Sequence, residues 1–321
     1  MKIGFYTKYK KGKKIRYVGD QMYAEYMCKS LNKIKGVSAK LYAPDDLPEE
    51  KLDFIIYLND TAPIKNLAEK HILYMQNFYP QGFEKALELF EQLNYDGYMF
   101  ASKKVFNLHK SNGFKGIYLP FATDTSLFYP RKKSKNFIFD VSYIGNDIKG
   151  TERSTKYLLP AINFNFALFG RWGPSKKQIL KEILHFKNPF RRPEYQRVFM
   201  KICRGRISQE DSTVLYTNSK INLNCHGQDA IDQEIITGRV LDILACRGFL
   251  ISDSSEAMKK ELKGRCVFTE GGEDLIQKIK YYLNHPKERN KISKKGYAYV
   301  KKNHSMEGRA KTLYNYLKKL S

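Results

Sequence analysis

The chain has 321 residues, 42% of them hydrophobic and 14% aromatic, which excludes a disordered protein and, at about 150 residues per domain, predicts two domains with packed cores. No apolar run approaches the ~18 residues that span a bilayer. The five cysteines are scattered and form no C-x-x-C pair, so they indicate neither a disulfide framework nor a zinc site; they favour a reducing cytoplasm. The net charge of +24 indicates either a polyanionic partner, such as a phosphorylated substrate, nucleic acid or an anionic membrane surface, or lysines on solvated helix faces.

The first 130 residues show alternating strand and helix patterns. Residues 2–7 predict a buried strand, residues 8–16 a basic loop, and the segment after them an amphipathic helix. Alternation of this kind predicts a mostly parallel sheet with helices on both faces. Asp20, Asn59 and Asp60 fall at strand-to-helix transitions, where each is either a site residue or a helix N-cap. Further strands are expected at residues 39–42, 54–58, 71–75, 97–101 and 116–119, with helices at 83–93 and 103–111.

A proline-bounded stretch, residues 120–130, separates this pattern from a second one. We expect a domain linker there, with one domain over residues 1–130 and the other over residues 136–303. Strands at 137–145 and 164–169 both end in glycine and polar residues, which predicts either a ligand-binding edge or turns that glycine closes.

A basic segment rich in aromatic residues follows at 174–206. Its composition is typical of a nucleic-acid contact, of an amphipathic patch on an anionic membrane, or of a solvated helical insertion. Beyond it, helices are expected at 208–216, 273–283, 286–301 and 306–320.

The stretch 219–253 concentrates polar residues between two apolar strands. The first strand stops before His226, a helical pattern carrying Glu234 and Asp242 follows, and the second strand ends at Asp253. In open α/β sheets, ligands bind at such strand ends and helix starts. Because Glu234 and Asp242 are eight positions apart, about two turns, one predicted helix would present both near one face. They are either site residues or two ordinary helix carboxylates.

Five short motifs occur in a characteristic order. They are Y-L-P-F-A-T-D at 118–124, D-V-S-Y-I-G-N at 140–146, S-K-I-N-L-N-C-H at 219–226, R-V-L-D-I-L-A-C at 239–246 and N-H-S-M-E-G-R at 303–309. In this order and spacing the chain resembles the GT-B glycosyltransferases, in particular the group related to the spore-maturation protein CgeB. The resemblance implies an α/β fold of two Rossmann-like domains facing an inter-domain cleft, with a terminal helix at 304–321 returning to the first domain.

The resemblance also implies that the second domain binds a nucleotide-activated sugar. Asp242 occupies the position of an acidic residue, usually Glu, that holds the ribose hydroxyls. Glu234 corresponds to an acid that contacts the donor sugar in many retaining enzymes, and Arg247 stands where the family often has glycine. These matches make Glu234 a catalytic candidate and Asp242 a donor-binding one.

A leaving nucleoside diphosphate requires positive charge, which GT-B enzymes commonly supply without a metal. Arg239 and a helix N-terminus can supply it here, so we expect no metal and no other cofactor. Gly145 and Arg171, at strand ends of the second domain, are further donor-binding candidates. His226 is either a donor contact or a hydrogen-bonded loop histidine. Asp20 is the catalytic candidate in the first domain.

These features predict a glycosyltransferase that moves a sugar from a nucleotide-sugar donor to a glycan, a lipid-linked or a protein acceptor, with Glu234 favouring retention. We expect a cytoplasmic protein, either free or peripheral at the inner face of the cell membrane, and no nucleic-acid partner. Two alternatives stay open. One is a basic nucleic-acid-binding protein, although no helix-turn-helix, RNP or zinc signal is present. The other is a catalytically inactive GT-B scaffold.

Overall fold

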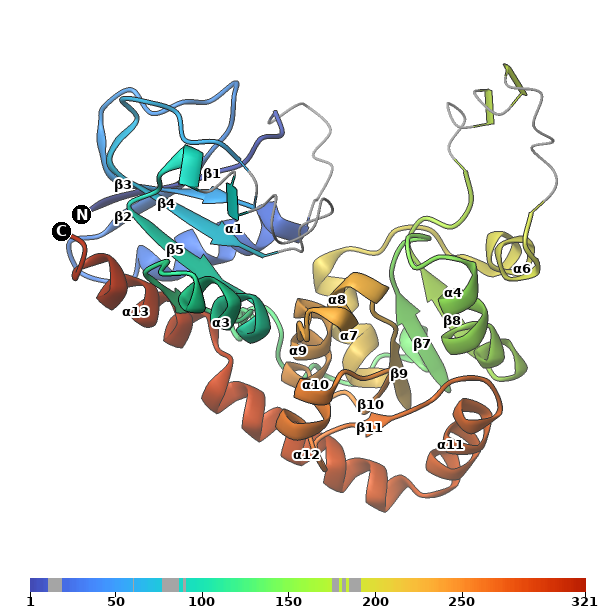
Figure 1. Cartoon of the computed structure of the whole chain (residues 1–321). Coiled ribbons are helices and arrows are strands. Elements are labelled where there is room, and N and C mark those ends of the chain that lie inside the picture. The colour runs from blue at the N-terminus through green and yellow to red at the C-terminus, as the bar shows by residue number, and fades with distance from the viewer. Residues whose placement is uncertain are drawn as a thin grey trace. The chain divides into compact units, whose positions relative to one another are not determined.

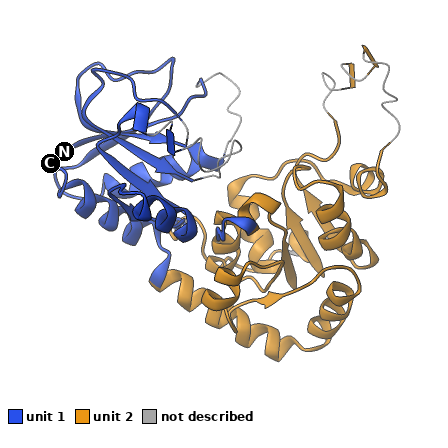
Figure 2. Ribbon diagram, viewed as in Figure 1, with its two compact units in different colours: residues 1–124, 232–236, 303–321 blue, residues 125–231, 237–302 orange. Residues whose placement is uncertain are grey.

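The chain forms two compact α/β units (Figures 1 and 2). A computed structural model describes residues 1–10, 19–59, 61–76, 87–88, 91–174, 179–180, 183–184 and 192–321. Unit 1 comprises Met1–Asp124, Asp232–Ile236 and Asn303–Ser321, and unit 2 comprises Thr125–Ile231 and Thr237–Lys302. Most of the expected loop at 8–16 and of the expected helix at 83–93 lies outside the described residues, as do residues 175–178, 181–182 and 185–191 of the expected basic segment at 174–206. The rest of that segment is described and includes a helix at Glu194–Ile202, whose Tyr195 and Phe199 are buried in an apolar core.

Unit 1 is built on a parallel sheet with the strand order β2-β1-β3-β4-β5-β6. The strand expected at 54–58 is nearly continuous in apolar residues because helices cover both of its faces. The predicted alternation of strands and helices is therefore confirmed. The strands are β1 (Lys2–Tyr6), β2 (Ser38–Tyr42), β3 (Leu52–Leu58), β4 (Ala68–Met75), β5 (Gly97–Phe100) and β6 (Gly116–Tyr118), and the helices α1 (Gly19–Leu31), α3 (Lys103–Ser111) and α13 (Met306–Leu317).

The C-terminal helix α13 packs into the core of unit 1. Met306, Ala310, Leu313 and Leu317 recur at intervals of four, three and four residues, and all are at most 1% exposed. This spacing gives α13 one apolar stripe, which lies against α1 and the sheet. A polar contact adds to the packing, because the Tyr98 backbone N–H of β5 donates to Tyr316 Oη at 3.1 Å.

Unit 2 repeats the parallel architecture with the strand order β11-β10-β9-β7-β8. Its largest apolar cluster joins β7, β8, β9 and β10 to α4, α6 and α11 on one face. The strands are β7 (Val141–Ile144), β8 (Phe166–Phe169), β9 (Ile221–Asn224), β10 (Leu250–Ser252) and β11 (Val267–Phe268). The helices are α4 (Thr151–Tyr157), α6 (Glu194–Ile202), α7 (Gln209–Asn218), α8 (Gln228–Asp232), α9 (Gly238–Ala245), α10 (Glu256–Glu261), α11 (Gly272–Asn284) and α12 (Pro286–Asn303), with 3-10 turns at Lys135–Phe137 and Leu159–Asn163.

Each sheet has a point at which the winding of the chain reverses. In unit 1 it lies between β1 and β3, and in unit 2 between β7 and β9, because the first strand of each unit is flanked by its second and third strands. Crossovers leave such a point toward opposite faces of the sheet, which opens a crevice at the carboxyl ends of the two strands. The topology therefore marks one candidate binding edge in each unit.

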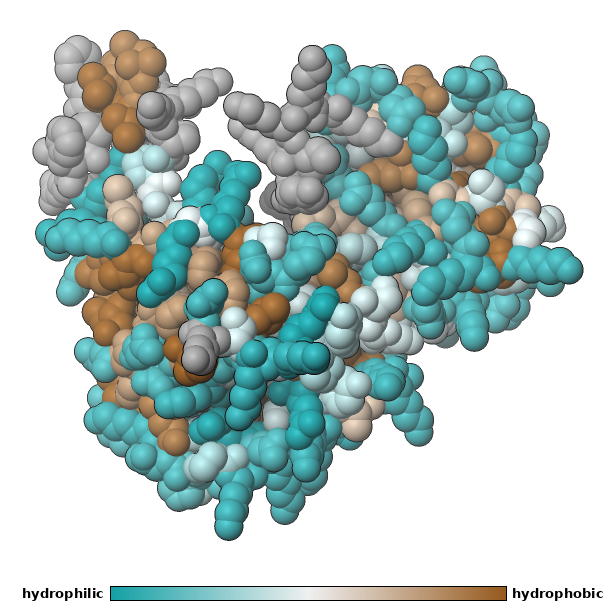
Figure 3. All heavy atoms as spheres, turned by 180° about the vertical axis from the view of Figure 1, so that it is seen from behind, coloured by the Kyte–Doolittle hydropathy of each residue, from teal (hydrophilic) through white to brown (hydrophobic). Residues whose placement is uncertain are grey.

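The exterior is mostly polar. Hydrophilic side chains predominate on the face that Figure 3 presents, in keeping with the 57 lysines and arginines of the chain. In the part of the chain that the structure describes, no helix is both long enough and apolar enough to cross a bilayer.

Gly170 gives a test of the packing at the ends of β7 and β8. Its φ of +128° is strained for any other residue, and an added Cβ would lie 2.0 Å from the Gly145 carbonyl oxygen. We expect Gly170→Ala to lower the free energy of unfolding by about 2 kcal/mol or more, measured by urea denaturation. Gly238→Ala is the matched control, since a Cβ there meets nothing within 4 Å. Equal stability of the two variants would contradict this account.

Candidate functional site

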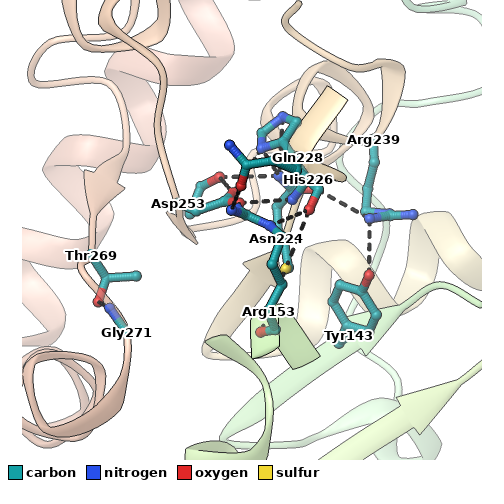
Figure 4. Close-up of polar contacts among 11 residues, drawn as sticks. Tyr143, Arg153, Asn224, His226, Gln228, Arg239, Asp253, Thr269 and Gly271 are labelled. Atoms are coloured by element: carbon teal, nitrogen blue, oxygen red, sulfur yellow. Dashed lines mark hydrogen bonds and ion pairs between the residues drawn. The ribbon is translucent and has the colours of Figure 1, made fainter. Parts of the chain in front are cut away.

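Polar side chains converge at the binding edge of unit 2. The strand register pairs Asn224, the last residue of β9, with Ser252, the last residue of β10, and Asn224 Nδ2 donates to Ser252 Oγ at 3.0 Å. His226 and Asp253 follow these strand ends directly, and both are 1% exposed (Figure 4). Burial of so many polar groups is costly unless each finds a partner, so the site is built as a hydrogen-bonded network.

The carboxylate of Asp253 is the centre of this network. It accepts from the backbone N–H of His226 at 2.9 Å, lies 2.7 Å from His226 Nδ1, and pairs with the Arg153 guanidinium of α4. Burial by itself would raise the pKa of Asp253, but the hydrogen bonds from His226 and the charge of Arg153 outweigh burial and hold that pKa below its ordinary value. Asp253 is therefore an ionised acceptor that joins β10, the loop after β9, and α4.

His226 serves as the buried anchor of its loop. Its side chain is fully buried, and Arg153 Nε donates to its carbonyl oxygen at 2.9 Å. Arg153 Nη1 also reaches Gln228 Oε1 at 2.8 Å, at the start of α8. The structure thus supports the hydrogen-bonded reading of His226. Arg153 thus links helix α4 to the loop after β9.

Arg239 is a half-buried cation at the reversal point between β7 and β9. It lies at the start of α9, and its Nη1 donates to Tyr143 Oη and to Asn224 Oδ1, each at 3.2 Å (Figure 4). The guanidinium carbon also lies 5.0 Å from the Tyr143 ring centroid. Both partners are neutral, and no carboxylate among the described residues pairs with Arg239. Its charge is therefore available to an anionic ligand.

Lys149 is a second cation at this edge, which sequence reasoning missed. It follows β7, is half-buried, and makes no hydrogen bond or ion pair with any residue in the described ranges. Burial and then the nearby charge of Arg239 lower the pKa of Lys149 to about 8. Its place between a strand end and the start of α4 is the signal that could have identified it. Two neighbouring cations without acidic partners favour a ligand with more than one negative charge.

Gly145 directly follows the end of β7, and Arg171 follows the end of the neighbouring strand β8. Arg171 is exposed at a cavity of about 350 Å³, and its backbone N–H donates to Asn146 Oδ1 at 3.0 Å. Asp147 also lines this cavity, and its carboxylate accepts from Tyr195 Oη at 2.9 Å. Gly145 permits close packing, because a Cβ there would lie 2.6 Å from Tyr143 Oη. The segment around Lys149 adjoins this cavity, which is lined by Ile148 and Gly150 among others.

The prediction that one helix carries both Glu234 and Asp242 is wrong. Helix α8 ends at Asp232, Glu234 lies in a turn with a φ of 57°, and α9 begins only at Gly238. A residue in this left-handed conformation interrupts a right-handed helix, so the regular spacing of the two acids does not place them on one face. Asp242 lies on α9 and is half-buried.

The turn that carries Glu234 belongs to unit 1, within Asp232–Ile236, rather than to the second α/β unit. It is held there by hydrogen bonds to backbone carbonyls. Ser102 Oγ donates to the Gln233 carbonyl at 2.6 Å, and Lys104 Nζ donates to the Asp232 carbonyl at 2.9 Å. Sequence spacing could not reveal this, because both donors lie about 130 positions away along the chain.

Asp20 lies at the reversal point of unit 1. Asn59, at the end of β3, donates from Nδ2 to Asp20 Oδ2 at 2.8 Å, and its Oδ1 accepts from the Gln76 backbone N–H at 3.0 Å. Asn59 has a φ of 58° and is 8% exposed, so its side chain is fixed between the ends of β3 and β4. Asn59 thus orients the Asp20 carboxylate, while Asp60 lies outside the described residues.

The family described as glycosyl transferase-like matches residues 154–315, just over half of the chain. No curated protein matches the sequence. Among solved structures, the sucrose-phosphate synthase of Thermosynechococcus elongatus has a TM-score of 0.71 at 12% identity, covering 99% of this chain and 98% of that one. T4 phage BGT in complex with its UDP-glucose substrate has a TM-score of 0.62 at 16% identity, covering 99% of each chain.

Anabaena Alr3699/HepE, solved in complex with UDP and glucose, has a TM-score of 0.65 at 9% identity, covering 99% of this chain and all of the other. Identities this low establish likeness of fold, and the likeness extends over both parallel-sheet units. The predicted GT-B fold is therefore confirmed. With the sequence match and the fold in agreement, the chain belongs to the glycosyl transferase-like family and is a GT-B glycosyltransferase.

Proposed function

We propose that the chain transfers a sugar from a nucleotide-sugar donor and that the donor diphosphate binds at the reversal point of unit 2. The observation that carries this proposal is the pair of cations, Arg239 and Lys149, which have no acidic partner among the described residues. Even partial burial of a guanidinium costs free energy unless a ligand or a polar network compensates it. A diphosphate carries the charge and the several acceptor oxygens that such a pair can bind.

The geometry also fits the chemistry of the leaving group. Negative charge builds up on the departing nucleoside diphosphate, and fixed positive groups lower the barrier most when they are already in position. Arg239 is held by Tyr143 and Asn224, and it stands at the start of α9, where the helix dipole adds partial positive charge. Two solved proteins of similar fold, T4 phage BGT and Anabaena Alr3699/HepE, are known in complex with UDP-glucose, which supports a nucleotide sugar as the ligand class.

The remaining donor-side residues take supporting roles in this proposal. Asp242 would bind the ribose hydroxyls, Gly145 would let the ligand approach the backbone after β7, and Arg171 would contact the donor from the adjoining cavity. His226 would keep the loop after β9 in shape through Asp253. Membership of the CgeB-like group is part of the same proposal and rests on the order of the five sequence motifs.

We assign the catalytic roles to Asp20 and Glu234, both in unit 1. Asp20 has its carboxylate oriented by Asn59, which suits a group that exchanges a proton with the acceptor. Glu234 would contact the donor sugar and favours retention. The acceptor would be a glycan or a lipid-linked or protein-linked acceptor. Most of the expected anionic-surface loop at 8–16 lies outside the described residues. In the described part of the basic segment 174–206, Tyr195 and Phe199 are buried in the core of unit 2 and so are not part of an exposed patch.

Thermal shift with sugar nucleotides tests the donor site. A ligand that binds only the native state raises Tm by mass action, so we expect one of UDP-, GDP-, CMP- or dTDP-sugars to raise it. Lys149→Gln should weaken that binding about tenfold, the loss of roughly one charge-assisted hydrogen bond. Lys260→Gln, an exposed lysine on α10, is the control and should bind as wild type does. No shift with any sugar nucleotide would overturn the proposal.

The same residue predicts a pH dependence. Because the pKa of Lys149 is lowered to about 8 from 10.5, its positive charge is fully present only well below pH 8 and is lost as the pH rises through that value. Donor affinity should therefore fall above pH 8 in wild type, when measured by calorimetric titration. The Lys149→Gln variant should lack this fall, and an identical profile in both proteins would exclude Lys149 from the site.

Asp20→Asn separates catalysis from donor binding. We expect it to lower kcat roughly 100- to 10,000-fold, the usual contribution of a general acid or base, while the donor-induced Tm shift stays unchanged. Release of nucleoside diphosphate provides the measurement. Glu25→Gln, an exposed acid on the same helix, should retain full turnover. Full turnover in Asp20→Asn would remove Asp20 from the mechanism but leave the donor site intact.

We further propose that transfer needs no metal, since Arg239 and Lys149 can carry the charge that a metal would otherwise neutralise. Turnover should then be the same after exhaustive treatment with EDTA and after re-addition of Mg²⁺ or Mn²⁺. A fall of tenfold or more on chelation, reversed by either ion, would show that a metal takes part.

A further inference from the structure

Helix α12 carries a row of lysines that the proposed donor chemistry does not use. We name Lys287, Lys291, Lys294, Lys295, Lys301 and Lys302 the α12 lysine row; all six are exposed. At about 100° per residue, the six positions fall within an arc of about 120° on the helix circumference. The buried positions Ser293, Gly296 and Val300 occupy the opposite side. The row therefore forms one solvent-facing edge, about 22 Å long at 1.5 Å per residue.

The charges of this row are not neutralised within the protein. None of the six lysines makes an ion pair with a residue in the described ranges, and the row itself contains no acidic side chain. The acid nearest in sequence, Glu288, accepts a hydrogen bond from Tyr281 Oη at 2.8 Å. Six like charges along a single edge repel one another, and an anionic surface would relieve that repulsion.

Each of the helices α10, α11 and α13, in contrast, carries at least one acidic side chain in an ion pair with a lysine. Lys259 on α10 pairs with Glu256 at 3.0 Å, Lys278 on α11 pairs with Asp274 at 2.7 Å, and Glu307 on α13 pairs with Lys33. Mixed charges of this kind are typical of solvated helix faces. The α12 lysine row differs from those faces because its six charges have one sign and no ion pair among the described residues; Figure 1 shows where α12 lies in the chain.

We propose that the α12 lysine row binds the anionic headgroups of a lipid bilayer. A flat bilayer lets every lysine of a straight edge reach phosphate or carboxylate groups at once, and each lysine near such a surface adds to the attraction. Lysine suits this partner because its compact charge imposes no bidentate geometry. This inference goes beyond the proposed transfer reaction and does not depend on it.

Duplex nucleic acid fits the row less well. Proteins that recognise a specific DNA sequence present arginine, asparagine or glutamine to the base edges, and phosphate contacts flank these residues. The centre of the α12 arc carries Ala298 instead, and Asn290 Oδ1 already accepts from Arg247 Nη2 at 3.0 Å. The described edge thus offers charge without groups free to read bases.

Vesicle flotation tests the proposal with the full-length chain. Wild type should bind vesicles of equal parts phosphatidylcholine and phosphatidylglycerol and should not bind phosphatidylcholine alone. A variant with all six row lysines changed to Gln should bind the anionic vesicles at least tenfold more weakly. Its melting temperature and its sugar-nucleotide Tm shift should match wild type, so that loss of folding or of the donor site would be recognised.

A matched control separates the effect of the α12 lysine row on vesicle binding from the effect of the overall net charge of +24. It changes six exposed lysines of unit 1 to Gln and so loses the same charge; they are Lys35, Lys103, Lys110, Lys115, Lys311 and Lys319. This control should bind anionic vesicles within twofold of wild type. Equal losses in the two variants would overturn the proposal, as would wild type that ignores anionic vesicles. Loss of duplex DNA retention by the row variant, with vesicle binding unchanged, would point to nucleic acid instead.

Discussion

The buried carboxylate of Asp253 is the constraint on which the unit 2 site depends. It receives the backbone and imidazole of His226 from one element and the guanidinium of Arg153 from another, at 1% exposure. Loss of one partner from a buried ion pair typically costs about 3–5 kcal/mol, because a charge is left without compensation. The loop after β9 is thereby held at the strand ends, and Asn224, which orients Arg239, is packed beside it.

The two units share a winding pattern but carry different chemistry at their reversal points. In unit 2 the groups without acidic partners are cationic, Arg239 and Lys149, and they suit a phosphate-bearing ligand. In unit 1 the corresponding place holds a carboxylate, Asp20, fixed by the amide of Asn59. The same topology thus places cations at the reversal point of one unit and a carboxylate at that of the other. The fold sets where these residues lie, and their side chains set what they can do.

Much of the fold followed from local patterns in the sequence. The run at residues 54–58 is continuously apolar and short, which is typical of a strand buried on both faces. Leu313 and Leu317 belong to an apolar stripe with the period of a helix. The site was less predictable. Glu234 and Asp242 have helical spacing, yet the left-handed turn at Glu234 ends that register. The position of Lys149 between a strand end and a helix start is a weak signal, because its burial and its nearness to Arg239 come only from the fold.

The sequence by itself determined that the chain forms two parallel α/β units and that polar residues gather at strand ends, because both depend on spacing along the chain. Only the tertiary structure decided which of these residues meet. In the fold His226 is a buried anchor of its loop, Arg153 contacts and supports it, and Arg239 has no acidic partner among the described residues. These contacts form because the sheet brings β7, β9 and β10 side by side from positions up to about 100 residues apart. Burial, charge compensation and the sign of a pKa shift depend on those neighbours, and no local pattern contains them.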